Sequence, residues 1–122
     1  MILADTSVWI AHFRSGVQEL QEALNRGQIA IHPHIVAELA LGSLKDRTRT
    51  LALLDSLPQV RVAKLSELRL MIEARRLYSL GIGVSDAHLI ASAFLDPPTL
   101  VWTRDKRLRQ VAEAFGIHAR LP

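Results

Sequence analysis

The chain has 122 residues, of which 49% are hydrophobic, and it carries a formal net charge of +3. This length predicts a single domain, and a mean hydropathy of +0.17 predicts a well-filled core and excludes a largely disordered chain. The absence of cysteine excludes disulfides, thiolate metal sites and cysteine nucleophiles. No apolar run reaches the roughly 18 residues of a membrane span, and the N-terminal MILADTSVWI has no basic leader. We therefore expect no membrane segment, no signal peptide and a cytoplasmic location.

Short apolar runs alternate with helical patterns along the whole chain. In chain order the expected elements are a strand at 2–4, a helix at 5–27 interrupted near residue 16, a strand at 28–31, helices at 33–42 and 46–57, a strand at 60–63, helices at 66–81 and 86–95, a strand at 100–103, a helix opening at 105, and an added edge strand at 117–121. Short apolar strands separated by helices are typical of a parallel sheet covered on both faces. The sequence therefore predicts a three-layer α/β/α fold with a short parallel sheet of four to five strands, in one domain covering residues 1–122.

Four acidic residues occupy positions where a carboxylate is costly without a partner: Asp5, Glu38, Asp86 and Asp105. Asp5 and Asp105 follow predicted strands, and function collects at the carboxyl ends of strands in such sheets. Taken singly, each aspartate is also an ordinary helix cap or first-turn acid. Glu38 lies on an apolar helix, so we expect it to be partly shielded from water. Together the four suggest one shared divalent cation, and oxygen ligands select Mg²⁺ or Mn²⁺ over Zn²⁺.

Other polar motifs give weaker signals. Ser7 and Thr103 place hydroxyls beside the acids, where they can orient a carboxylate or a metal-bound water. His32 and His34 can be drawn as a metal set with Glu38, but ordinary surface histidines fit this pattern better. No phosphate-binding glycine loop and no GxSxG motif is present, which counts against a nucleotide-binding loop and a serine hydrolase.

Arginine accounts for 12 of the 15 basic residues, and the sequence pI is about 10.0. Arginine is suited to bidentate contact with phosphate, and a cation-rich surface around an acidic pocket would suit a polyanion. A GC-rich genome would produce the same arginine excess, so the composition leaves both interpretations open.

Four short segments, taken in order, resemble those of PIN-domain proteins, and in particular the VapC toxins of bacterial type II toxin–antitoxin systems. They are hydrophobic-Asp-Thr-Ser at 3–7, Val-x-Glu-Leu at 36–39, Ser-Asp-Ala-x-Leu-Ile-Ala at 85–91 and Thr-Arg-Asp-Lys-Arg-Leu at 103–108. The resemblance covers essentially the whole chain. It implies a PIN fold, a parallel sheet between helices with an acidic pocket.

The resemblance also implies an activity, a site and partners. The activity is Mg²⁺- or Mn²⁺-dependent hydrolysis of RNA, in a homodimer that a small VapB-type antitoxin neutralises by filling the acidic pocket. The matching site residues are Asp5, Glu38, Asp86 and Asp105 as metal-binding and catalytic acids, with Ser7 and Thr103 as supporting hydroxyls. The fourth acid is the more variable one in this family, so Asp105 is the one expected to lie outside direct metal contact. Candidates for contact with the RNA backbone, or alternatively plain surface charges, are Arg75, Arg76, Arg104 and Arg107.

Three alternatives to a toxin nuclease remain open at this point. A PIN-like fold can serve as a catalytically silent RNA-binding or assembly module, although all four acids are retained here. A PIN nuclease can also have a non-toxin role in RNA processing. A phosphoaspartate protein also places an acid after its first strand, but a phosphatase of that kind would need a second aspartate where this chain has Ser7.

Overall fold

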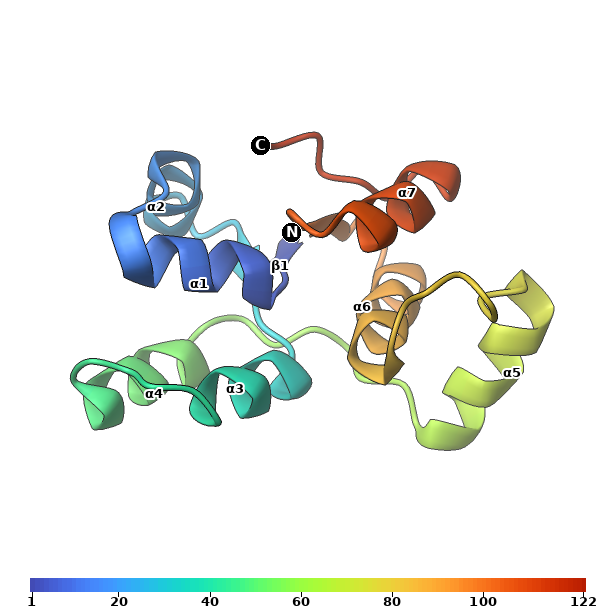
Figure 1. Ribbon diagram of the computed structural model, residues 1–122, viewed down its shortest axis with the longest axis horizontal. Helices are drawn as coiled ribbons and strands as arrows, with labels where there is room; N and C mark the ends of the chain where they lie inside the picture. Colours follow the sequence, from blue (N-terminus) through green and yellow to red (C-terminus); the bar gives the residue numbers. More distant parts are fainter.

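The computed structural model describes residues 1–122 and has seven helices and three strands (Figure 1). The strands are β1 (Ile2–Ala4), β2 (Ile29–Ala30) and β3 (Leu100–Trp102). The helices are α1 (Thr6–Ser15), α2 (Gln18–Asn25), α3 (Pro33–Ala40), α4 (Arg47–Asp55), α5 (Leu65–Arg75), α6 (Val84–Leu95) and α7 (Lys106–Ala114). The predicted α/β class is confirmed. None of these helices combines the length and the apolar character that crossing a membrane would require.

The sheet is parallel, and β1 is its central strand in the order β2-β1-β3. In Figure 1 it lies near the middle of the molecule, with α1 to α4 on one side and α5 to α7 on the other. Helices cover the sheet, and the strand side chains are apolar, as in other parallel sheets. The paired residues Leu3 and Val101 are fully buried. Ala4 pairs with Trp102 at the ends of β1 and β3. The residues that follow this pair therefore leave the sheet together at its carboxyl edge.

The predicted count of four to five strands is wrong, because the segment at 60–63 is not a strand. The backbone pairing here is a single parallel bridge between Gln59 and Ile31, the residue after β2, in which Val60 N–H donates to the Ile31 carbonyl at 3.1 Å. Beyond this bridge the Arg61 carbonyl accepts a hydrogen bond of 2.6 Å from Ser92 Oγ on α6. The backbone of the segment is thus attached to a helix where a strand would need a neighbouring strand.

The segment at 117–121 does not extend into an edge strand either. It makes a single parallel bridge, in which the N–H of Val101 donates to the carbonyl of Ile117 at 2.7 Å. Two residues after this bridge, Arg120 has a left-handed backbone with φ of 57°. An extended strand cannot include that conformation, so the pairing ends after one bridge.

Candidate active site

Asp5 follows β1 and is the N-cap residue of α1. Its carboxylate accepts hydrogen bonds from the backbone N–H groups of Ser7 at 3.0 Å and Val8 at 3.3 Å, and from the Ser7 hydroxyl. The residue is only 4% exposed. Burial raises the pKa of Asp5 above its usual value, whereas the hydrogen bonds from Ser7, Thr103 and Val8 act to lower it. The carboxyl edge of the central strand therefore holds a buried acid that is fixed in orientation by short-range hydrogen bonds.

Two hydroxyls connect Asp5 to the far end of the chain. Thr103 follows β3, is fully buried and donates its hydroxyl hydrogen to Asp5 Oδ2. The Thr103 oxygen also accepts from the backbone N–H of Asp105 at 2.9 Å, and the Ser7 oxygen accepts from the N–H of Arg104 at 2.8 Å. The turn between β3 and α7 is thereby tied to the start of α1.

Asp86 lies in the first turn of α6, half-buried, where its Oδ2 accepts a hydrogen bond of 3.4 Å from the backbone N–H of Gly83. Desolvation raises the pKa of Asp86, and the negative charges of Asp5, Asp105 and Glu38 raise it further. Each of the other three predicted acids is therefore near enough to Asp86 to repel its negative charge.

Glu38 and Asp105 form the exposed part of this acidic group. Glu38 was expected to be shielded, but it is exposed because Ile35 and Leu39 occupy the buried face of α3. Asp105 is the N-cap residue of α7, and its Oδ1 accepts from the backbone N–H of Leu108 at 2.9 Å. Asp105 is therefore held by the helix that it caps, whereas Glu38 extends into solvent.

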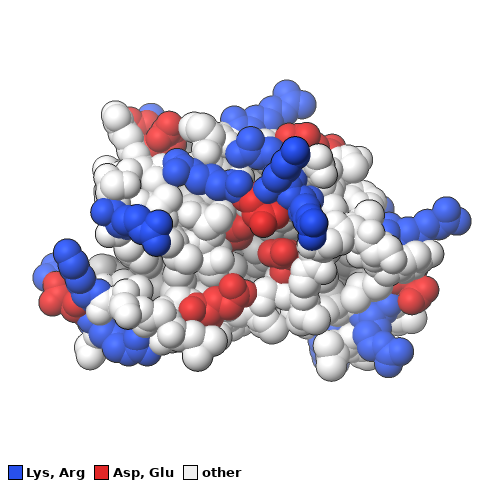
Figure 2. Space-filling model, in the orientation of Figure 1, with Lys and Arg blue, Asp and Glu red and all other residues white.

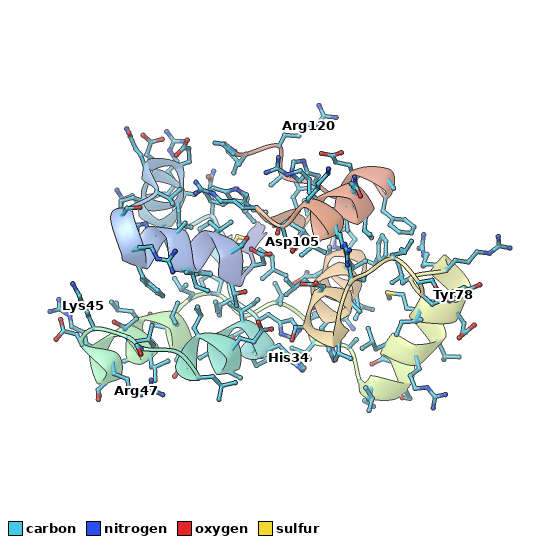
Figure 3. The ribbon with its side chains drawn as sticks, in the orientation of Figure 1. His34, Lys45, Arg47, Tyr78, Asp105 and Arg120 are labelled. Atoms are coloured by element: carbon cyan, nitrogen blue, oxygen red, sulfur yellow. The ribbon has the colours of Figure 1, made fainter.

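None of the four carboxylates is paired with a basic side chain. The structure has one ion pair, in which Glu113 and His118 lie 3.9 Å apart. Figure 2 shows acidic side chains near the middle of one face, with basic side chains along one side of them, and Figure 3 places Asp105 in this central region. In this arrangement no three acidic or histidine side chains are close enough to enclose a metal ion.

Comparison with known proteins identifies the family. The family model of the PIN domain matches residues 2–114. The chain belongs to the PIN-domain family. This PIN domain is 42% identical over 117 residues to Ribonuclease VapC32 of Mycobacterium tuberculosis, in strains CDC 1551 / Oshkosh and ATCC 25618 / H37Rv, with 96% of this chain and 94% of each relative covered. The resemblance to the VapC branch is therefore confirmed over nearly the whole chain.

A groove with a volume of about 680 Å³ lies beside Glu38, the one predicted acid in its lining. Thr6 and Glu38 contribute polar groups to its lining, and Ile10, Phe13 and Leu44 contribute apolar ones. Ile10 and Phe13 are 44% and 40% exposed although both are large apolar side chains. An apolar surface therefore extends outwards from the carboxylates between α1 and the segment that follows α3.

The arginines predicted to contact phosphate all lie on the surface of the PIN domain: Arg75, Arg76, Arg104 and Arg107. Their environments differ. The Arg107 side chain packs so closely on Gly81 that a Cβ added there would lie 2.7 Å from Nη1. Arg75 instead lies over the ring of Phe94, 4.4 Å from its centre, near the C-terminal end of α6. Arg107 therefore connects the first turn of α7, the helix that Asp105 caps, to the loop before α6, the helix that carries Asp86.

Three histidines meet between α3 and α6: His32 and His34, which the sequence placed together, and His88, which it did not group with them. The ring centres of His34 and His88 are 4.2 Å apart, and those of His32 lie 5.2 and 5.5 Å from them. The expectation of surface histidines is wrong for His32, which is fully buried, and His88 is only 5% exposed. Burial lowers the pKa of His32 to about 4, with a smaller contribution from His34 and His88, and burial also lowers the pKa of His88. The sequence contains one sign of this burial, because His88 lies inside the apolar run of the predicted 86–95 helix.

Proposed function

We propose that this PIN domain is a Mg²⁺- or Mn²⁺-dependent endoribonuclease, the toxin of a type II toxin–antitoxin pair, with residues 1–122 forming one domain. The observation that carries the proposal is the gathering of four carboxylates with no basic side chain paired to any of them. Clustered acids of this kind are stable when a cation bridges them or a proton neutralises one of them. The 42% identity to a protein named as a ribonuclease supports the assignment of RNA as the substrate.

The side chains proposed to hold the metal are Asp5, Glu38, Asp86 and Asp105, with Asp5 and Asp86 as the main ligands. Their chemistry fits Mg²⁺ or Mn²⁺, because all the donors are carboxylate oxygens. Burial, and after it the charges of the other three acids, raise the pKa of Asp86, and a bound cation would offset both effects. Exposed Glu38 has the freedom to turn towards the others. Asp105 caps α7 through one of its oxygens, which leaves the other oxygen for the metal or for a bound water.

The bound metal would polarise the scissile phosphate and stabilise the charge that develops on the leaving oxygen. The side chains of the protein would orient the metal-binding carboxylates and the attacking water. The hydroxyls of Ser7 and Thr103 hold the Asp5 carboxylate in one position. Glu38 would orient the attacking water and accept its proton as the new bond to phosphorus forms. The leaving oxygen would take a proton from solvent as its bond to phosphorus breaks.

The RNA backbone is proposed to lie along Arg104 and Arg107, which stand on either side of Asp105 in the sequence at the start of α7. Arg75 is not proposed to contact RNA, because its guanidinium packs on Phe94 at the other end of α6. In Figure 2 the basic side chains lie beside the acidic centre, an arrangement that would attract a polyanion and deliver one phosphate to the carboxylates.

The proposed protein partners are a VapB-type antitoxin and a second copy of this chain. The groove beside Glu38 has apolar lining together with charged groups of both signs, Glu38 and Asp46 beside Arg14 and Lys45, which suits an antitoxin segment that carries apolar and charged side chains. For the homodimer, helix α5 and the residues before it offer exposed apolar side chains: Val62, Leu65 and Leu70 are 45%, 65% and 72% exposed. The proposed site of action is the cytoplasm, where the RNA substrate is found.

Cleavage of structured RNA by the purified protein, with and without Mg²⁺ or Mn²⁺, tests the proposed activity. The matched variant is Asp5→Asn, which keeps an oxygen to accept the N-cap hydrogen bonds but removes the charge. We expect metal-dependent cleavage by the wild type and none by the variant. Equal cleavage by both proteins would assign the activity to a contaminant. Metal-independent RNA binding without cleavage by the wild type would identify a binding module instead.

A further inference from the structure

The histidine cluster, defined as His32, His34 and His88, lies where the two helices that carry Glu38 and Asp86 meet. Figure 1 shows α3 beside α6, and Figure 3 places His34 at their junction. His34 is four residues before Glu38, so both side chains lie on the same face of α3. His88 is in the second turn of α6, just beyond Asp86. A shift of one helix against the other at this junction would therefore change the separation of the two acids.

Each histidine of the cluster is held by its own contact. Nδ1 of His32 accepts a hydrogen bond of 3.0 Å from the N–H of His34 and so caps the start of α3. The ring of His34 packs on the ring of His88 with an angle of 34° between their planes. Nδ1 of His34 lies 3.5 Å from the hydroxyl of Ser85, the residue before Asp86. The start of α3 is thus connected to the start of α6 by ring packing and by one polar contact.

Packing alone does not account for histidine at these positions. His32 Nε2 and His88 Nδ1 are buried and have no hydrogen-bond partner. A buried polar atom without a partner costs about 1–3 kcal/mol, so an apolar side chain of similar size would stabilise the fold more. Because Nδ1 of His32 accepts a hydrogen bond, its Nε2 carries the proton and cannot coordinate a metal while that cap is in place. The cluster is therefore better suited to fixing geometry than to binding a second metal.

We propose that the histidine cluster is a positioning device that sets the spacing of Glu38 and Asp86 and thereby the affinity of the acidic site for Mg²⁺ or Mn²⁺. This inference rests on the proposed metal-dependent function. Mg²⁺ requires near-octahedral oxygen ligands at about 2.0–2.1 Å, so a small displacement of one acid-bearing helix would weaken binding. Residues that orient metal ligands without touching the metal typically change its affinity by about 10–100-fold when they are replaced.

The test compares the Mn²⁺ dissociation constants of the wild type, His34→Ala and His34→Phe by titration calorimetry, with RNA cleavage measured across metal concentrations. His34→Ala removes both the ring packing and the contact with Ser85, and we expect its dissociation constant to rise about tenfold. The cleavage rate at saturating metal should return close to that of the wild type, because the acids themselves are intact. His34→Phe keeps a ring against His88 and should recover most of the lost affinity.

His12→Ala is the matched control for general destabilisation. Like the His32 ring, the His12 ring accepts a backbone hydrogen bond, here from Val17 N–H at 3.0 Å. His12 lies near the C-terminal end of α1, outside the histidine cluster. This variant should lose thermal stability without a change in Mn²⁺ affinity. If His34→Ala does not fold, Ser85→Ala replaces it, with a smaller rise in the dissociation constant expected.

Two results would overturn the inference, and they have different meanings. An unchanged dissociation constant in folded His34→Ala, or a change equal to that of His12→Ala, would refute the positioning role and leave the proposed nuclease intact. A wild-type protein that binds no Mn²⁺ at all would refute the metal-dependent function and this inference with it.

Discussion

Thr103, at the end of β3, donates its hydroxyl hydrogen to Oδ2 of Asp5, at the end of β1. The two residues are 98 positions apart in the chain, and parallel pairing of Ala4 with Trp102 brings them together. The same hydroxyl oxygen accepts the backbone N–H of Asp105. One buried side chain therefore fixes the orientation of the central acid and the start of the turn that carries another.

Replacing Thr103 with valine should weaken both the fold and the site. Valine has nearly the same shape, but it leaves Oδ2 of the buried Asp5 carboxylate and the N–H of Asp105 each without the hydrogen bond that Thr103 makes. We expect the free energy of unfolding to fall by about 1–3 kcal/mol, measured by denaturant titration. Because this hydrogen bond acts to lower the pKa of Asp5, its loss should also weaken Mn²⁺ binding. Thr103→Ser keeps the hydroxyl and is the control; a loss in Thr103→Val no larger than that in Thr103→Ser would contradict a specific contribution of the hydrogen bond.

Replacing Asp86 with asparagine should stabilise the metal-free protein. Burial raises the pKa of Asp86, and the negative charges of Asp5, Asp105 and Glu38 raise it further, so its ionised form is less stable in the folded protein than in the unfolded chain. Removing the charge should raise the free energy of unfolding by roughly 1 kcal/mol and Tm by about 4 °C. The same change should abolish the rise in Tm that added Mg²⁺ produces in the wild type.

Asp55→Asn is the control for this experiment, because Asp55 is an exposed acid at the end of α4. It removes the same charge away from the site, so Tm without metal and the response to Mg²⁺ should both stay as in the wild type. An Asp86→Asn protein that is less stable than the wild type would contradict the account of Asp86 as an acid destabilised by burial and by the neighbouring acids.

The central part of the site could be predicted from the sequence because its signals are local. An apolar triplet followed by an N-cap residue predicts the end of β1 and the start of α1, and the same reasoning applies to Asp105 and α7. The parallel arrangement then implies that residues after β1 and β3 share one edge. The contact of Asp5 with Thr103 follows from these two steps, and no knowledge of side-chain packing is needed for it.

The features that were not predicted depend on neighbours distant in the chain. The run at 60–63 has the composition of a strand, but it has no partner strand, and α6 takes its backbone carbonyl. Glu38 has apolar neighbours in sequence, yet the narrow buried face of an eight-residue helix excludes it. His32 and His88 come together only through the packing of α3 on α6. Composition and periodicity contain no information about such pairings.

Arg107 and Arg75 should affect RNA binding differently, although each replacement by alanine removes one positive charge. Binding is measured with Asp5→Asn as the background, which prevents cleavage. Loss of Arg107 should weaken RNA binding several-fold and reduce the dependence of log K on log salt concentration by about 0.7. Loss of Arg75 should leave RNA binding unchanged and lower stability by about 0.5–1 kcal/mol, because its guanidinium packs on Phe94. Equal weakening by both would show that net charge alone governs binding.

The buried His32 should make the fold sensitive to mild acid. Its pKa is about 4 in the folded protein and 6.5 in the unfolded chain, so the unfolded chain takes up the proton first as pH falls. The contribution of neutral His32 to stability is therefore complete above pH 6.5 and is lost progressively between pH 6.5 and about 4. The loss over this interval should be on the order of 3 kcal/mol, measured by denaturant titration at several pH values.

His32→Asn isolates this effect, because asparagine is a good N-cap residue but does not titrate. The variant should be less stable than the wild type at pH 7, since a smaller side chain leaves a cavity, but its stability should fall less between pH 6.5 and 4. Asp5 and Asp86 have raised pKa values in the folded protein, so their protonation increases stability as pH falls. His12 and His88 have lowered pKa values, so they decrease stability as pH falls, as His32 does. All four titrate in both proteins, so the difference between the two pH profiles reports His32 alone. Parallel profiles would mean that the acid sensitivity comes from other groups, and that the neutral state of His32 contributes nothing to it.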